Sequence, residues 1–243
     1  MNIVIAEDYD HMSRVAAGMV AAEMRWKPDL VLGLATGLTP LGMYRELVRM
    51  HREEGLDFSR IITFNLDEYY GLGPDDPQSY HHYMWENLFR HVNIRPQAVH
   101  VPPGQPADAA AACRAYDEAI DEAGGIDVQV LGIGRNGHVG FNEPGGTLRA
   151  ATHLIDLTAA TRRANARFFP DPDLVPRRAI SMGMRPIMQA RQVILLASGQ
   201  EKARAIRATV NGPLTTRVPA SLLQLHPRCT LVVDRQAAVL LAI

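Results

Sequence analysis

The chain has 243 residues, of which 47% are apolar, and its formal net charge is −1. This length suits one large α/β domain or two small ones, and the apolar content is sufficient for a sizeable core. The net charge is close to neutral and the sequence contains no block of residues of one charge, which argues against a nucleic-acid-binding protein and against a charged tail.

Five runs of β-branched and aliphatic residues alternate with segments that have apolar residues at helical spacing. In chain order the pattern predicts a helix over 11–24, a strand over 29–34, a helix over 40–51, a strand over 60–66, helices over 79–92 and 107–123, strands over 126–131 and 192–198, a helix over 200–210 and a strand over 229–234. Thr39 is the expected N-cap of the second helix, with Pro40 at its first position, and Ser79 is the expected N-cap of the third.

Strands that alternate with helices indicate parallel βαβ units. We therefore expect an α/β fold with a doubly wound, mostly parallel sheet and helices on both faces. No repeat or linker divides the sequence, so 1–243 is expected to form a single domain. The segment 144–190 is less regular and rich in Pro and Arg, and it could form a lid or an insertion over the edge of the sheet.

Ligands of such sheets bind outside the carboxyl ends of the strands. The segments expected there are ATGLTP, DEYYGL, GIGRNGHVGFNEPGG and SGQEK, which are polar and contain glycine. Their convergence on one edge would assemble a site from separate parts of the chain.

The segment GIGRNGHVGFNEPGG, residues 132–146, begins with the G-x-G-x-x-G pattern of dinucleotide-binding loops. That pattern requires a helix after its third glycine, and the glycines and proline that follow Gly137 oppose one. The side chains offer another interpretation: a carboxylate at Glu143 could orient and charge the His138 ring, as proton transfer requires. The local sequence leaves open whether His138 and Glu143 do this or merely satisfy backbone groups of the loop.

Residues 35–40, ATGLTP, place backbone N–H groups and two threonine hydroxyls at the start of a helix. This arrangement suits a phosphate or a carboxylate, although an ordinary capped turn has the same sequence. Lys202, in the first turn of a later helix, and Arg167 are candidate anion ligands. The alternative is that both are ordinary charged residues of the protein surface.

Asp67 and Glu68 follow the strand 60–66, and successive side chains of an extended segment point to opposite faces. Only one of them is therefore expected to face a site. His81 and His82 are adjacent and lack the spacing of a two-histidine zinc helix, so no catalytic metal is expected.

Seven segments together resemble the glucosamine-6-phosphate deaminase family, in the same order and with similar spacing. They are GLATGLTPLGMYREL, FNLDEYYGL, SYHHYMWENLF, LGIGRNGHVGFNEPG, TRRANARFF, LLASGQEKARAI and SLLQLHP, and they span nearly the whole chain. The resemblance implies conversion of glucosamine 6-phosphate and water to fructose 6-phosphate and ammonia, a hydrolase of amino sugar metabolism that acts in N-acetylglucosamine catabolism without metal or organic cofactor.

The same resemblance implies a role for each matched residue. Asp67 would move the proton between C2 and C1, and His138 would open the sugar ring with help from Glu143 and Asn136. The substrate phosphate would bind to Thr36, Gly37, Leu38, Thr39, Arg167 and Lys202. Some family members have aspartate at the position of Asn136, so Glu143 is expected to carry more of the charge stabilisation here.

Two alternatives remain at this point: a 6-phosphogluconolactonase-like hydrolase, which shares the glycine-rich loop, and a non-catalytic sugar-phosphate sensor. Hexameric, allosterically activated members of the family have basic residues where this chain has His153 and Ile155. We therefore expect no such activator site, and a monomer or small homo-oligomer. The N-terminal segment MNIVIAEDYD is unlike a signal peptide, no run has the roughly 18 apolar residues of a membrane helix, and the two cysteines lie far apart. We expect a cytoplasmic protein with no membrane or nucleic-acid partner.

Overall fold

The computed structural model describes residues 1–242 and is built around a parallel sheet. Within these residues the strands are β1 (Asn2–Ala6), β2 (Val31–Leu34), β3 (Ile62–Asn65), β5 (Val99–His100), β6 (Val128–Gly132), β9 (Gln192–Ala197) and β10 (Cys229–Asp234). Their order across the sheet is β1-β10-β9-β6-β2-β3-β5, and each neighbouring pair is parallel. The order reverses between β2 and β6, which confirms the predicted doubly wound sheet.

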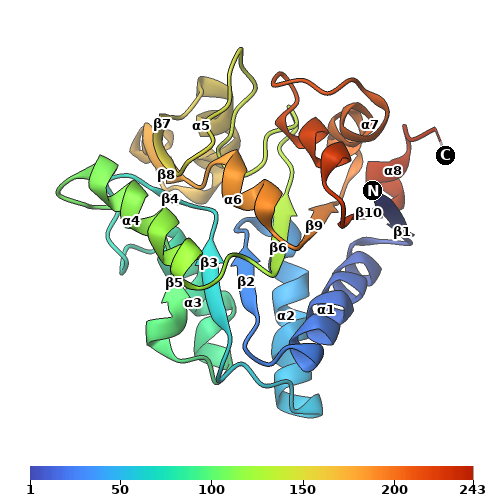
Figure 1. Cartoon of the computed structure of the whole chain (residues 1–243). Helices are drawn as coiled ribbons and strands as arrows, with labels where there is room; N and C mark the ends of the chain where they lie inside the picture. The colour runs from blue at the N-terminus through green and yellow to red at the C-terminus, as the bar shows by residue number, and fades with distance from the viewer. Residues whose placement is uncertain (243) are drawn as a thin grey trace.

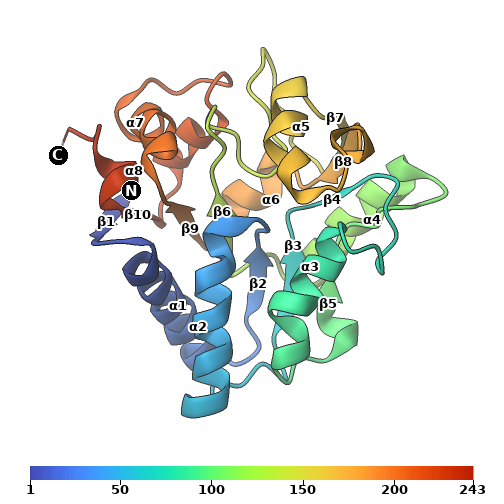
Figure 2. The ribbon, with the colours of Figure 1, turned by 180° about the vertical axis from the view of Figure 1, so that it is seen from behind.

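Helices cover both faces of this sheet (Figures 1 and 2). One core lies between the sheet and α1 (Tyr9–Trp26), α2 (Leu38–Glu54) and α3 (Tyr80–Asn87). The other core includes residues of α4 (Ala109–Glu122), α6 (Met184–Gln189), α7 (Ala203–Asn211) and α8 (Arg235–Ala238). Burial on both faces explains why the strands are continuous apolar runs without alternation.

The start of α2 differs from the prediction. The helix begins at Leu38, and its N-cap is Gly37, with φ 96°, so the expectation of Thr39 as N-cap and Pro40 as first residue is wrong. The left-handed glycine turns the chain two residues earlier, and Pro40 is tolerated because the first helical turn lacks backbone partners. The expected cap of α3 is confirmed, since the Ser79 hydroxyl accepts a hydrogen bond from the His82 N–H at 3.0 Å.

A second, antiparallel sheet was not predicted. It has the order β4 (Asp67–Tyr69), β8 (Arg178–Ser181), β7 (His153–Asp156). The Met182 N–H donates to the Leu66 carbonyl at 2.7 Å, just before β4 leaves the end of β3. The small sheet is thereby attached to the carboxyl end of the large one, and in both views it lies together with α5 (Ala159–Asn165) at that end (Figures 1 and 2).

The segment 144–190 is thus more regular than its sequence indicated, because it holds β7, α5, β8 and α6. Its movement as a lid stays a prediction. Short 3-10 helical turns complete the chain: η1 (Phe89–His91), η2 (Pro96–Ala98), η3 (Ala166–Phe168), η4 (Pro172–Leu174), η5 (Gln200–Lys202) and η6 (Pro219–Leu225). Among residues 1–242, no helix combines the length and apolar character needed to cross a bilayer.

Candidate active site

The loops after β2, β3, β6 and β9 meet around a cavity of about 1230 Å³. Of the residues singled out in the sequence, Thr36, Gly37, Leu38, Thr39, Asp67, Asn136, His138, Arg167 and Lys202 line this cavity. Glu143 lies behind the His138 ring and contacts it. The structure therefore brings together all the candidate residues at the sheet edge where parallel folds bind ligands.

Asp67 is the most deeply buried carboxylate of the cavity, with 6% of its surface exposed. Burial, and secondly the neighbouring Glu68 charge, raise the pKa of Asp67 to about 8. Within the described chain, no hydrogen bond to its carboxylate offsets this cost. An ideal Cβ at Gly140 would lie 3.5 Å from Asp67 Oδ2, so the glycine lets the β6 loop approach the carboxylate.

Glu68 points to the other side of the strand, as the alternation of an extended segment predicts. Its carboxylate accepts hydrogen bonds from the N–H groups of Tyr69, Tyr80 and His81, at 2.7, 2.9 and 2.9 Å. Two of these donors open α3, so Glu68 fixes the start of that helix. Burial raises the pKa of Glu68 to about 7, against the effect of the three donors.

His138 and Glu143 contact each other across their loop. His138 Nδ1 lies 3.4 Å from Glu143 Oε1, which is long for a hydrogen bond but close enough for an ion pair. Asn136 Nδ2 donates to Glu143 Oε2 at 2.9 Å. Burial opposes ionisation of Glu143, but His138, Thr161 and Asn136 outweigh it and hold its pKa below the ordinary value. The carboxylate therefore stands charged behind the imidazole.

The glycines of G-x-G-x-x-G serve this loop rather than a dinucleotide. Residues 133–152, which the structure describes throughout, form turns and no helix. A Cβ at Gly134 would lie 2.4 Å from the His138 ring, and Gly137 has φ 86°. These glycines admit the imidazole and turn the chain, which excludes the dinucleotide interpretation for lack of a helix N-terminus.

The start of α2 and the loop after β9 both line the cavity, where the sequence predicts an anion site. Thr36, Gly37, Leu38 and Thr39 line the cavity here, and the N–H groups of the first turn of a helix have no partners within the helix. Lys202 Nζ donates to the Ile133 carbonyl at 2.8 Å, which holds the cation at the cavity wall rather than in solvent. Burial lowers the pKa of Lys202; the charge of Glu201 opposes this effect, and Arg135 and Arg167 add to it. Positive charge is therefore concentrated here and favours an anionic ligand.

Some groups at the cavity or directly behind its wall were not predicted from the sequence. Tyr80 enters directly after the Ser79 cap, and its hydroxyl lies 3.3 Å from that of Tyr69. Asp234, at the carboxyl end of β10, accepts hydrogen bonds from Ser198 Oγ at 2.5 Å and from the Gly199 N–H at 3.0 Å. Because the predicted strand 229–234 ends in an aspartate, the sequence did indicate a polar side chain at this end of the sheet. The link from Thr161 to Glu143 had no such signal, because it joins segments whose pairing the sequence does not show.

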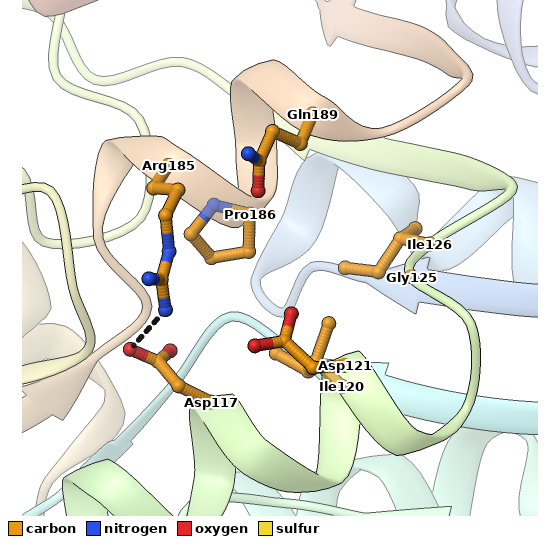
Figure 3. A pocket seen from close by; sticks show the side chains of 8 residues that line it. All are labelled: Asp117, Ile120, Asp121, Gly125, Ile126, Arg185, Pro186 and Gln189. Carbon is orange, nitrogen blue, oxygen red and sulfur yellow. Dashed lines mark hydrogen bonds and ion pairs between the residues drawn. The ribbon is translucent and has the colours of Figure 1, made fainter.

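A second hollow, of about 30 Å³, lies between α4 and α6 (Figure 3). Arg185 lies 3.1 Å from Asp117, and the Thr152 hydroxyl donates to the same carboxylate at 2.6 Å. This hollow is large enough for about one water molecule, and its carboxylate is already partnered, so we assign it a structural role. Among residues 1–242, no group of three or more His, Cys, Asp or Glu side chains is placed to hold a metal ion.

A family model described as "Glucosamine-6-phosphate isomerases/6-phosphogluconolactonase" matches residues 7–232. The chain is 58% identical to a glucosamine-6-phosphate deaminase of Halothermothrix orenii over 241 residues, covering 99% of this chain and 100% of that one. It is 50% identical to glucosamine-6-phosphate deaminase 2 of Bacillus subtilis, covering 98% and 96% of the two chains.

Among solved structures, one described as a monomeric glucosamine-6-phosphate deaminase superposes with a TM-score of 0.97 at 46% identity, covering 99% of this chain and 100% of the other. A 6-phosphogluconolactonase of Thermotoga maritima superposes with a TM-score of 0.75 at 22% identity, which shows the shared fold alone. The prediction of a hydrolase is wrong: the close relatives are named deaminases. The description of the matching family model begins with isomerases.

Proposed function

This chain belongs to the family of glucosamine-6-phosphate isomerases and 6-phosphogluconolactonases, and we propose that it converts glucosamine 6-phosphate and water to fructose 6-phosphate and ammonia. One observation carries the proposal: a buried carboxylate, Asp67, and a histidine–glutamate pair open into one cavity beside an anion site. An aldose–ketose isomerisation needs a base at carbon and a separate acid/base at oxygen, and these groups supply both.

Ring opening is the step that we assign to His138. The pyranose opens when a proton leaves the O1 hydroxyl and another is delivered to O5, and a group that alternates between base and acid serves both transfers. Glu143 stabilises the imidazolium that exists between these transfers, and Asn136 holds the second carboxylate oxygen.

Isomerisation and loss of the amine follow in the open chain. Asp67 takes the proton from C2 while the substrate ammonium gives one of its protons to the aldehyde oxygen O1, which yields an enolamine. Asp67 then returns its proton to C1, so that C2 becomes a protonated imine. Water adds to this imine and ammonia leaves, which yields the ketone of fructose 6-phosphate. The burial that raises the pKa of Asp67 to about 8 makes its carboxylate a stronger base than an exposed aspartate. The ammonium group of the substrate supplies positive charge that favours the ionised form.

The phosphate group is assigned to the anion site. The N–H groups and hydroxyls of Thr36–Thr39 would surround its oxygens, and Lys202 and Arg167 would neutralise its charge. Binding energy at this remote end holds C2 beside Asp67 and the ring oxygen beside His138.

We further propose that residues 1–243 act as one catalytic unit in the cytoplasm, as a monomer or small oligomer without the allosteric site of hexameric members. The monomeric description of the solved relative supports the quaternary part of this proposal. His153 and Ile155 lie on β7, and burial lowers the pKa of His153, which makes it a poor anion ligand at neutral pH.

The test is turnover by the purified protein. With glucosamine 6-phosphate and a chelator present, ammonia and fructose 6-phosphate should form in equal amounts, and Asp67→Asn should abolish both. Absence of both products from folded protein would overturn the proposal. Hydrolysis of 6-phosphogluconolactone without ammonia release would identify a lactonase, and sugar-phosphate binding without turnover would identify a sensor.

A further inference from the structure

We propose that the Thr161 hydroxyl is a positioning group that links phosphate binding at Arg167 to the proton-transfer pair His138–Glu143. The inference rests on the proposed function and concerns a residue outside its catalytic set. It starts from the surroundings of the Glu143 carboxylate, which the chain holds from two separate elements.

Two neighbours of Glu143, Asn136 and His138, belong to its own loop. The third is Thr161 of α5, whose Oγ1 donates to Glu143 Oε1. This is the same oxygen that faces His138 Nδ1 at 3.4 Å. The position and the charge of the atom that the imidazole meets therefore depend on a hydroxyl from another helix.

The proton of the Thr161 hydroxyl is committed to Glu143. The Thr158 hydroxyl, which caps α5, donates to Thr161 Oγ1 at 3.1 Å and so occupies one of its acceptor positions. A hydroxyl has a single proton to donate, and Thr161 directs it to the carboxylate. Thr161 has 6% of its surface exposed, so water does not compete freely for this contact.

The helix that carries Thr161 also leads to the phosphate site. α5 ends at Asn165 and continues without a break into η3, which carries Arg167. Arg163, Asn165 and Arg167 all line the cavity. An anion bound to Arg167 would restrain the position of this helical segment. The Thr161 hydroxyl, which determines the position of Glu143 Oε1, would be restrained with it. Phosphate binding would thus place the carboxylate correctly behind His138 before the ring opens.

The test compares Thr161→Val, which removes the hydroxyl but keeps the branched shape, with Thr161→Ser, which restores the hydroxyl. Thr158→Val is the matched control, because it weakens the same helix cap and leaves the Thr161 hydroxyl in place. We expect Thr161→Val to lower kcat about tenfold with KM changed less, which is smaller than the loss of a general acid/base. Thr161→Ser and Thr158→Val should stay within about threefold of the parent, in line with losses short of a proton-transfer group.

The titration of Glu143 gives a readout that a loosened helix would not change. Thr161 is one of the side chains that keep the pKa of Glu143 low, so its loss should raise the pH at which the carboxyl carbon NMR signal of Glu143 titrates. The other charged groups that line this cavity come from α2, from β4, from the β6 loop, from α5 and η3, and from η5: Arg45, Asp67, Arg135, Arg163, Arg167, Glu201 and Lys202. All of these are unchanged in the variants.

A measurement without turnover separates this inference from the proposed function. The carboxyl carbon NMR signal of Glu143, assigned with Glu143→Gln, should shift when inorganic phosphate is added to the parent, and should shift much less in Thr161→Val. If the parent shows this shift but makes no ammonia, the proposed function fails and the link stands. If the signal responds equally in both proteins, or if Thr158→Val reproduces the kinetic loss, the inference is overturned.

Discussion

Two aspartates at opposite ends of the same sheet differ in their hydrogen-bond and ion-pair partners. Asp127 stands before β6 at the amino end of the strands, and Asp67 follows β3 at the carboxyl end. Each has 6% of its surface exposed. Asp127 lies 2.6 Å from Lys27 Nζ, accepts from the Val31 N–H at 2.8 Å and pairs with Arg191. Asp67 has no such donors in the described chain.

The two carboxylates consequently titrate in opposite directions. Burial works against the charge of Asp127, but Lys27, the Val31 N–H and Arg191 outweigh it and hold its pKa below the ordinary value. Burial raises the pKa of Asp67 to about 8. Equally small exposure therefore has two outcomes: the partners of Asp127 let its charge stabilise the fold, whereas Asp67 keeps a raised pKa, as expected of a group that serves the proposed chemistry.

The largest effect should come from removing the charge of Asp67. Asp67→Asn is expected to lower kcat about 10²–10⁴-fold, the range for loss of a general acid/base. The same change should raise Tm at neutral pH, because the amide is buried without a penalty for ionisation. Steady-state assays and thermal unfolding check the two parts. A variant that loses activity together with stability would show that Asp67 supports the fold, as Asp127 does.

Asp127→Asn should give the reverse result. The amide cannot satisfy three donors, two of them cationic, and we expect a loss of about 2 kcal/mol in the free energy of unfolding. Activity per folded molecule should stay at the parent value, since Asp127 lies at the far end of the sheet. The folded pKa of Asp127 is depressed, so its contribution is present above the ordinary aspartate pKa and is lost as pH falls through the depressed value. Unfolding free energies from urea titrations should therefore differ between parent and variant at neutral pH and converge at acidic pH.

Much of this contrast was accessible from the sequence. The strand 60–66 and the alternation of Asp67 and Glu68 predicted that only one carboxylate would face a site, and of the two Asp67 lines the cavity. Apolar runs predicted the strands of the large sheet because both of its faces are buried. β1 was missed because its run is short and its residues are partly exposed at the sheet edge.

Other features depend on contacts between distant segments. The small sheet pairs Asp67 with Ser181 and His153 with Ser181, and periodicity within a segment does not reveal such partners. The N-cap of α2 was misplaced because a left-handed glycine leaves weaker local signals than a threonine before proline. The partners of Asp127, from α1, β2 and the start of β9, likewise come together only in the folded chain.

The unpartnered state of Asp67 also predicts a pH dependence. Because the base must lose its proton, kcat/KM should rise with pH through about 8, by about tenfold per unit below that value. Stability should move the other way. Between the ordinary aspartate pKa and about 8 the unfolded chain releases a proton that the folded chain keeps, so the parent loses stability relative to Asp67→Asn across this window. Unfolding free energies measured at several pH values would show a constant difference if Asp67 titrated normally.

The smallest effect is expected for a substitution of Glu68, which is buried like both aspartates and, like Asp127, has several hydrogen-bond donors. It is buried beside Asp67, yet three backbone N–H groups hold its carboxylate. Its charge is the second cause, after burial, of the raised pKa of Asp67. Glu68→Gln removes that charge, so the rise of kcat/KM should move to lower pH by less than about one unit, since burial remains.

Ser79→Ala is the matched control for Glu68→Gln. It weakens the start of α3 by about 1 kcal/mol without changing a charge, and its pH profile should equal that of the parent. The amine of the substrate titrates identically in every assay, so a difference between two pH profiles reports a change in the pKa of a group on the enzyme. A shift to lower pH in Glu68→Gln alone would show that the adjacent carboxylate strengthens the base. Equal profiles for parent, Glu68→Gln and Ser79→Ala would mean that burial without hydrogen-bond donors, and not the charge of Glu68, sets Asp67 apart from Asp127.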